Sequence, residues 1–209
     1  MKNRRSIVEI LALSMSILLF TWFFYKIKVW WFEGLYYLLV LCMVIYFQYN
    51  SHVPLKTQGI RFDNFMISIK PVMIATALFT ILITGISYLL NGGQWRLDMF
   101  SRTPWFLIWG TIQQFLLQSF LLIRVRSIVQ NKYLTVIIST LIFCAMHIPN
   151  PLLVIFTFVG GLVWCGIFIG YPNIFALGLS HAIIDLWLLA VFPAELLANL
   201  RVGGLYLAY

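Results

Sequence analysis

Long apolar runs alternate with short polar stretches along this chain, and most of the runs have the length of membrane crossings. A helix needs about 20 mainly apolar residues to cross the hydrocarbon core of a bilayer. Runs without interior Lys or Arg predict spans at Ile7–Tyr25, Val29–Tyr49, Pro71–Leu90, Trp105–Ile123, Leu134–His147, Leu152–Ile169 and Ile174–Val191. The fifth run is short, so its helix either begins earlier or tilts little and lies among neighbours. The pattern predicts an all-α, polytopic membrane helix bundle of about seven transmembrane helices.

Two shorter stretches between or after these runs are amphipathic. Apolar residues recur at helical spacing through 62–69, and Asp63 is expected to cap that helix. This pattern is typical of a helix that lies in the headgroup plane of the membrane. Pro193 suits the first turn of a second short helix that continues through Leu200.

The composition agrees with lipid as the main solvent of the chain. Of its 209 residues 62% are hydrophobic and 10% are charged, whereas an ordinary soluble domain has roughly 25% charged residues. The net charge of +8 does not indicate nucleic acid, because Lys and Arg lie at helix ends without a basic face. Cys42, Cys144 and Cys165 fall inside apolar runs without metal-ligand spacing. We interpret them as packing residues.

The basic N-terminal residues and the apolar run after them resemble a secretory signal, but the segment that follows the run does not. The segment after the first run, Thr21–Lys26, is bulky and aromatic where a signal peptidase needs small residues, so we expect an uncleaved first span. With the N-terminus in the cytoplasm, nine Lys and Arg face inward and five face outward, which favours this orientation. Without internal repeats, we expect one transmembrane domain over 1–209, in a bacterial plasma membrane.

Ionisable residues inside spans are candidates for a functional site, because each costs about 2.5–3.5 kcal/mol at the bilayer centre. Glu9 and Glu33 lie near the starts of their spans, where the headgroup region can solvate them, and we assign them structural roles. Asp185 lies well inside the last span, with His181 four residues earlier on the same face. A carboxylate at that spacing can orient an imidazole.

Two other runs carry polar groups. Gln113, Gln114 and Gln118 lie in the fourth run, where Gln114 and Gln118 share a face. They can serve a site or simply form hydrogen bonds between helices, and both interpretations stay open. Phe143 and His147 are also four residues apart, before a Pro149-Asn150-Pro151 turn. Two histidines and one aspartate in so small a bundle favour a convergent site. Gly160, Gly161 and Gly166 are expected to let helices approach closely.

The order and spacing of these groups resemble the CAAX-prenyl-protease and bacteriocin-processing (CPBP, or Abi) family of intramembrane peptidases. That family has three signatures: Glu-Glu-x-x-x-Arg, Phe-x-x-x-His and His-x-x-x-Asn or Asp. Phe143-x-x-x-His147 matches the second and His181-x-x-x-Asp185 matches the third. The first aligns only in position, because this chain has Gln113-Gln114-x-x-x-Gln118. The resemblance covers roughly 104–193.

The resemblance implies an endopeptidase that acts on a hydrophobic or membrane-tethered peptide, such as a prenylated or leader peptide, without cofactor or metal. By position, Gln113 stands where the family has the base that activates water, beside Gln114, and His147 assists. His181 and Asp185 line the oxyanion side, while Gln118 and Phe143 are expected to contact substrate. The partners implied are the lipid bilayer and the peptide or a partner protein, and no nucleic acid.

The first motif departs from the family in a way that affects the chemistry. A carboxamide has essentially no basicity near neutral pH, so Gln113 can position a water but cannot take its proton. General-base assistance contributes roughly 10²–10⁴-fold to a rate. The arginine is also replaced, by Gln118, so a charged triad has become a neutral one.

Several alternatives follow from this departure. His147 or His181 could act as the base, with Asp185 holding the tautomer. His147, His181 and Asp185 could instead hold a catalytic zinc, although no His-Glu-x-x-His spacing is present. Engineered inactivation is another explanation for the glutamines. The chain could also be a catalytically silent member that binds a membrane partner as a regulator, chaperone or immunity factor. A small transporter is the last alternative, although the sequence shows no inverted repeat.

Overall fold

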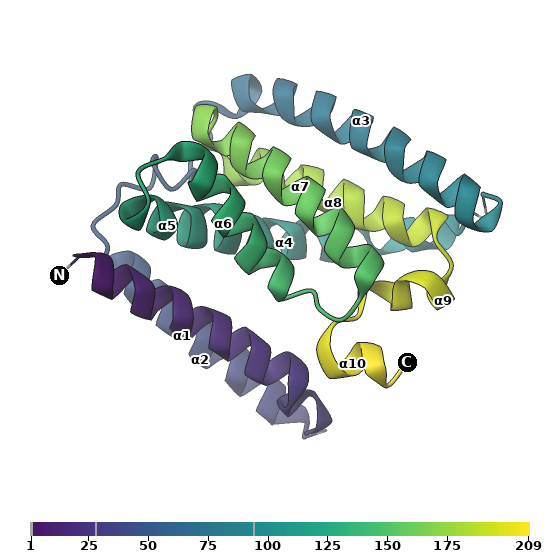
Figure 1. The fold of residues 1–209 in the computed structure, drawn as a ribbon, viewed down its shortest axis with the longest axis horizontal. Coiled ribbons are helices and arrows are strands. Elements are labelled where there is room, and N and C mark those ends of the chain that lie inside the picture. The colour runs from purple at the N-terminus through teal and green to yellow at the C-terminus, as the bar shows by residue number, and fades with distance from the viewer. Residues whose placement is uncertain (1, 28, 94) are drawn as a thin grey trace.

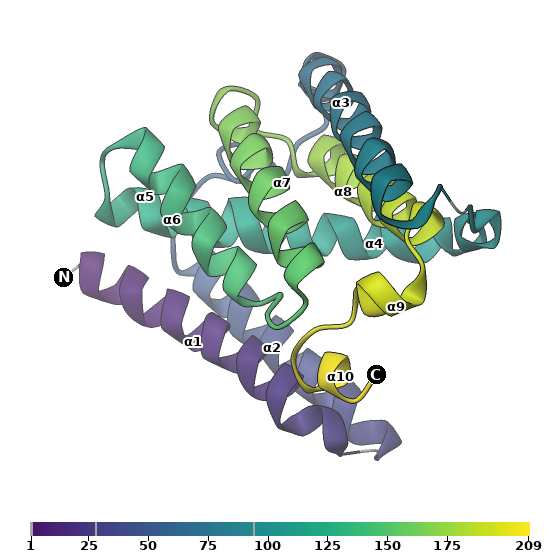
Figure 2. The same cartoon turned by 45° about the vertical axis from the view of Figure 1, so that its right-hand side comes forward.

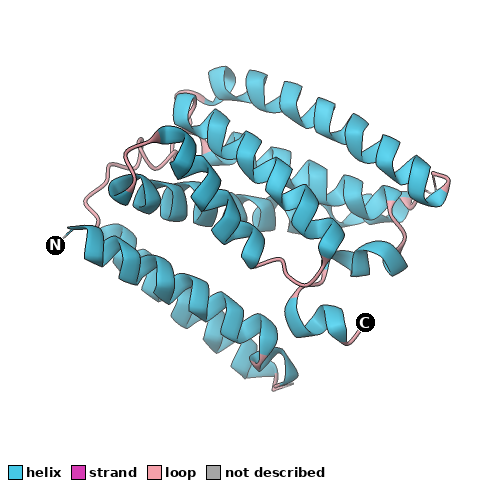
Figure 3. Ribbon diagram, viewed as in Figure 1, coloured by secondary structure: helices cyan, strands magenta, loops and turns pink. Residues whose placement is uncertain are grey.

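The described part of the chain is built from helices and contains no strand (Figure 3). The computed structural model describes residues 2–27, 29–93 and 95–209. The helices are α1 Lys2–Trp22, α2 Trp30–Tyr49, α3 Phe65–Asn91, α4 Thr103–Gln114, α5 Ile123–Ile128, α6 Lys132–Ala145, α7 Pro151–Gly170, α8 Ile174–Val191, α9 Ala194–Leu197 and α10 Gly203–Leu207. Short 3-10 turns lie at Phe24–Lys26, Leu97–Arg102 and Ala198–Leu200, and a π-helix joins α4 to α5 at Phe115–Leu122. The predicted all-α bundle is confirmed.

Six helical stretches in the described ranges are long and apolar enough to cross a membrane: 3–26, 31–49, 65–91, 97–128, 151–170 and 174–191. The chain is therefore a multi-pass integral membrane protein. The fifth predicted run forms α6, which has 14 residues and is shorter than a crossing requires. His147 lies beyond the end of α6 rather than inside it.

Helix α8 is the centre of the bundle. It packs against α4 on one side and α3 on another, while α7 packs against α6 (Figure 2). Helices α1 and α2 lie together along the other side of α6, and α10 contacts α1 (Figure 1). The N-terminus, the α5–α6 turn and the α7–α8 turn lie at one end of the bundle, at the left of Figure 1.

The predicted helix in the headgroup plane at 62–69 is wrong. Its second half belongs to α3, which runs without a break through Pro71. Proline removes one backbone N–H but its φ suits a helix, and the apolar residues that follow continue the helix past it. Asp63 does not cap α3, whose N-cap position is Asn64. The helix predicted after Pro193 is present as α9, but it ends at Leu197, because Ala198, Asn199 and Leu200 have positive φ of 47°, 51° and 63°. The predicted continuation through Leu200 is therefore wrong.

Close packing between helices is confirmed at Gly161, where a methyl group would lie 2.8 Å from the Thr140 side chain on α6. A methyl group on Gly160 would lie 3.1 Å from the ring of Trp164, which belongs to α7 itself, and 3.4 Å from the Phe79 ring on α3, an ordinary contact distance. Gly166 has no neighbouring atom within 4 Å of such a methyl group. The prediction for Gly166 is therefore wrong, because this glycine faces away from the neighbouring helices.

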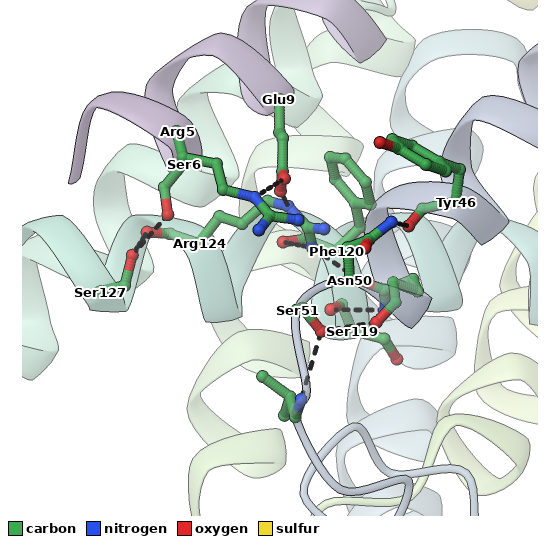
Figure 4. Close-up of polar contacts among 12 residues, drawn as sticks. Arg5, Ser6, Glu9, Tyr46, Asn50, Ser51, Ser119, Phe120, Arg124 and Ser127 are labelled. Carbon is green, nitrogen blue, oxygen red and sulfur yellow. Dashed lines mark hydrogen bonds and ion pairs between the residues drawn. The ribbon is translucent and has the colours of Figure 1, made fainter. Parts of the chain in front are cut away.

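Glu9 is held by a buried ion pair, so the interpretation that headgroup water solvates it is wrong. The Arg124 Nε donates to Glu9 Oε2 at 2.6 Å, and the Arg5 Nε donates to Glu9 Oε1 at 2.7 Å (Figure 4). Arg124 also donates to Gln48 Oε1 on α2 at 2.7 Å and lies over the Phe120 ring at 3.6 Å. This cluster connects α1 and α2 to α5.

Removing one member of this pair is expected to destabilise the bundle. Breaking a buried ion pair typically costs about 3–5 kcal/mol, because the remaining charge stays buried without its partner. Glu9→Leu should lower the free energy of unfolding by about that amount, measured by denaturation of the purified protein in detergent. Glu9→Leu combined with Arg124→Met should recover most of the loss. Glu195→Gln should change little, because Glu195 is exposed and has no ion-pair partner within the described ranges. Equal stability of Glu9→Leu and the wild type would contradict the role of the pair.

Candidate functional site

The site lies where α4 and α8 approach most closely, and glycine permits that approach. A methyl group on Gly110 of α4 would lie 2.8 Å from the Gly178 carbonyl oxygen, and one on Gly178 would lie 2.8 Å from Thr111 Cα. These distances are shorter than a carbon atom tolerates, so only a hydrogen atom fits at either position. The two backbones therefore touch one turn away from the polar motifs.

The close approach joins two of the glutamines to His181. Gln114 Nε2 lies 3.0 Å from His181 Nδ1, and Gln118 Nε2 donates to Gln114 Oε1 at 3.0 Å. Gln114 and Gln118 are completely buried. Because the Gln114 oxygen already accepts from Gln118, its amide nitrogen is the group that donates to His181.

This contact fixes the tautomer of His181. Its Nδ1 accepts a hydrogen bond, so the proton of the neutral ring is on Nε2. That nitrogen lies 3.6 Å from Asp185 Oδ2, which is longer than a hydrogen bond. The Trp164 ring stacks on the imidazole at 4.5 Å between centroids, and Trp164 Nε1 donates to Ser180 Oγ at 3.0 Å. His181 is thus a fixed hydrogen-bond donor.

His147 has the opposite tautomer. Its Nδ1 lies 2.8 Å from the Phe143 carbonyl oxygen, and a carbonyl can only accept, so Nδ1 has the proton. In the neutral ring the Nε2 lone pair is then free to accept a proton. The Phe143 ring lies edge-on to both imidazoles, at 4.8 Å from His147 and 6.3 Å from His181 between centroids. Of the two histidines, His147 has the geometry of a base.

A cavity of about 900 Å³ reaches this polar group. Its walls are mostly apolar and come from α1, α2, α4, the π-helix, α7 and α8, including Leu13, Val40, Trp105, Leu116 and Phe156. At its polar part the lining includes Gln113, His147, His181 and Asp185, with Phe143 beside them. Small-molecule and peptide sites commonly have this character, a concave apolar space with a few convergent polar groups.

The structure divides the predicted site residues into two groups. Gln113, His147, His181, Asp185 and Phe143 line the cavity. Gln114 and Gln118 do not line it and lie behind His181, where they orient its ring. Gln118, for which substrate contact was expected, therefore has a supporting position.

The described side chains do not form a set of zinc ligands. Over residues 2–27, 29–93 and 95–209, no group of three or more His, Cys, Asp or Glu side chains is placed to hold a metal ion. Both Nδ1 atoms already have partners, the Phe143 carbonyl and the Gln114 amide.

Three contributors to the site were not predicted. Gly110 and Gly178 permit the α4–α8 contact, and Trp164 covers one face of His181. The π-helix that begins directly after Gln114 was also missed, although π-helical turns often occur at functional sites. A glycine next to a polar motif inside an apolar run is the one signal that could have indicated Gly110 and Gly178.

The fold and this site define a multi-pass membrane protein with a buried polar site open to an apolar cavity. Residues 94–187 match the family model described as "Type II CAAX prenyl endopeptidase Rce1-like". This match supports the resemblance predicted from the motifs: residues 94–187, a little under half of the chain, are similar to the CAAX-protease (CPBP) family. Neither the curated proteins nor the solved structures gave a match.

Proposed function

We propose that this protein is an intramembrane endopeptidase in which a histidine replaces the family's missing glutamate. The substrate would be a hydrophobic or membrane-tethered peptide, prenylated or with a leader segment. The observation that carries the proposal is the free Nε2 lone pair of His147 beside the cavity that Gln113, His181 and Asp185 also line. The apolar walls of that cavity suit a lipid-soluble peptide.

The proposed reaction uses one water and needs no other reactant. Gln113 positions the water through its amide, and His147 Nε2 takes a proton as the water oxygen attacks the peptide carbonyl carbon. The carbonyl electron pair moves to its oxygen, and the His181 Nε2–H, which Asp185 does not hold at hydrogen-bond distance, donates to that oxyanion. The C–N bond then breaks as His147 returns the proton to the leaving nitrogen. The products are a carboxylic acid and an amine.

A catalytically silent family member that binds a membrane peptide or partner protein is the second candidate. The observation in its favour is the neutral hydrogen-bond network of Gln114, Gln118 and His181. In this network Gln114 and Gln118 stand where the family has its second glutamate and its arginine. Such a protein would use the same cavity for binding alone, as a regulator or immunity factor.

Peptide termini distinguish these two candidates. Membrane and secreted peptides would be compared between cells with the wild type, a deletion, and the His181→Ala variant. A new terminus that appears only with the wild type is the result expected for a peptidase. If no terminus differs, while His181→Ala rescues a deletion phenotype, catalysis is excluded and the binding function is supported.

A further inference from the structure

A second pocket, separate from the cavity of the site, lies at the end of the bundle that holds the N-terminus. It has a volume of about 440 Å³ and lies between the α2–α3 loop, the π-helix with α5, and the end of α7. Three cationic side chains line it: Lys56, Arg61 and Arg126. The remaining lining is mainly apolar and includes Leu122, Ile123, Phe168 and Pro172.

Hydrogen bonds to the α7–α8 turn hold the cationic loop in place. Asn173 Nδ2 donates to the Arg61 carbonyl at 2.9 Å and to Asn64 Oδ1 at 2.8 Å, and Asn64 Nδ2 donates to the Pro172 carbonyl at 3.1 Å. The backbone N–H of Ile174 donates to the Gly59 carbonyl at 3.0 Å. Arg61 and Lys56 are therefore displayed on a fixed frame.

The pocket keeps a net positive charge. Asp63 is the acidic partner of this loop: it accepts from Arg61 Nε at 2.7 Å and Nη2 at 2.6 Å, and Lys56 Nζ lies 3.4 Å from it. The Arg61 guanidinium, with Lys56, lowers the pKa of Asp63 to about 2, so it stays ionised at neutral pH. Arg126 has no ion-pair partner among the described residues. Three cations and one carboxylate give a net charge of +2.

The apolar lining and the position of the pocket indicate what kind of anion would enter. The helices α3, α5, α7 and α8 all begin or end at this end of the bundle, where lipid headgroups meet the protein. Basic pockets between transmembrane helices at this depth commonly hold anionic headgroups. A small hydrophilic anion would gain nothing from Ile123, Ile169 and Pro172, the half-buried apolar residues of the lining, whereas the acyl carbons of a lipid would pack on them.

We propose that this pocket binds an anionic phospholipid, with its phosphate between Arg126, Arg61 and Lys56 and its glycerol and first acyl carbons against Ile123, Ile169 and Pro172. The recognised chemistry is a phosphate group. The apolar wall makes the lipid, rather than free phosphate, the ligand. This lipid site does not depend on peptidase activity, because it lies apart from the cavity that holds His147 and His181.

Native mass spectrometry of the full chain in a neutral detergent tests the proposal. The protein would be titrated separately with phosphatidylglycerol and with phosphatidylcholine, and bound lipids counted. Phosphatidylglycerol is expected to bind in preference. Arg126→Gln should weaken its binding about fivefold and Arg126→Glu about 25-fold, from about 1 kcal/mol per charge. Arg126 is exposed, so these variants are expected to fold, and unchanged thermal unfolding would verify this.

Two controls identify the pocket and the source of the phosphate. Arg4→Gln removes the same charge from an exposed position at the same end of the bundle and should leave lipid binding unchanged. Inorganic phosphate added in excess should not displace the lipid. If Arg4→Gln and Arg126→Gln weaken phosphatidylglycerol binding equally, the assignment of the lipid to this pocket is overturned. The lipid would then be attracted by the overall positive charge at this end of the bundle. Displacement by inorganic phosphate, or equal binding of both lipids, would overturn the assignment to an anionic phospholipid.

Discussion

The His147→Ala variant is expected to cleave the peptide substrate at least 100-fold more slowly than the wild type, at unchanged protein stability. General-base assistance contributes roughly 10²–10⁴-fold, and His147 is the histidine whose Nε2 lone pair is free, because its Nδ1 donates to the Phe143 carbonyl. The measurement is the rate at which the wild-type-specific terminus appears in membranes that contain equal amounts of each protein.

Two comparisons make this result specific. His52→Asn removes a histidine from the exposed α2–α3 loop, where the backbone has φ of 54°, a conformation that Asn tolerates. It should cleave at the wild-type rate. His181→Ala should also reduce the rate, through the oxyanion, since loss of one such donor costs about 10²–10³-fold in a well-studied protease. Undiminished cleavage by His147→Ala would remove His147 from the role of base.

The Gln113→Glu variant is expected to gain activity, but by less than the roughly 10²–10⁴-fold that a general base supplies, because His147 already acts as a base in the wild type. Gln113 lines the cavity, so a carboxylate there can accept a proton from the water that the amide only positions. Because Glu and Gln have nearly the same shape, the packing of α4 should be preserved. The measurement is the same cleavage rate, compared with the wild type.

The neighbouring glutamine provides a matched control. Gln114→Glu introduces the same chemical change one residue later, but at a completely buried position that donates to His181 Nδ1. A carboxylate cannot donate that hydrogen bond, so Gln114→Glu should lose activity and stability. If Gln113→Glu is stable and gains no activity over the wild type, the proposed position of the water is wrong. Gain of cleavage in Gln113→Glu from a fully inactive wild type would instead identify a silent member with a decayed site.

The buried ion pair shows which long-range contacts were not predictable. Glu9 and Arg124 are separated by 115 positions in sequence, and nothing in either local pattern indicates the other as its partner. From the sequence, Glu9 is a carboxylate near a helix start and Arg124 a cation near a helix end. Only the placement of α1 against α5 brings them to 2.6 Å, because a helix pattern defines which face is apolar but not which helix covers it.

The tautomers of the two histidines illustrate the same limit at the site. The four-residue spacing of Phe143 and His147, and of His181 and Asp185, predicted that each pair shares a helical face. The spacing also suggested that Asp185 would hold the His181 ring. In the structure Gln114 of another helix contacts Nδ1 at 3.0 Å, while Asp185 lies 3.6 Å from Nε2. The role of each imidazole thus depends on atoms contributed by neighbouring helices and backbone.

What the sequence determined by itself is local: the apolar runs, the all-α class, and the motifs that indicate the family. The last span shows this best, since the predicted Ile174–Val191 is the observed α8. Helix formation in lipid depends on hydrogen bonds and side chains within one segment, so composition and spacing suffice. The tertiary structure alone decided the Gly110–Gly178 approach, the cavity, the Glu9–Arg124 pair and the basic pocket. Each of these joins residues distant in sequence, and their contact depends on how whole helices pack.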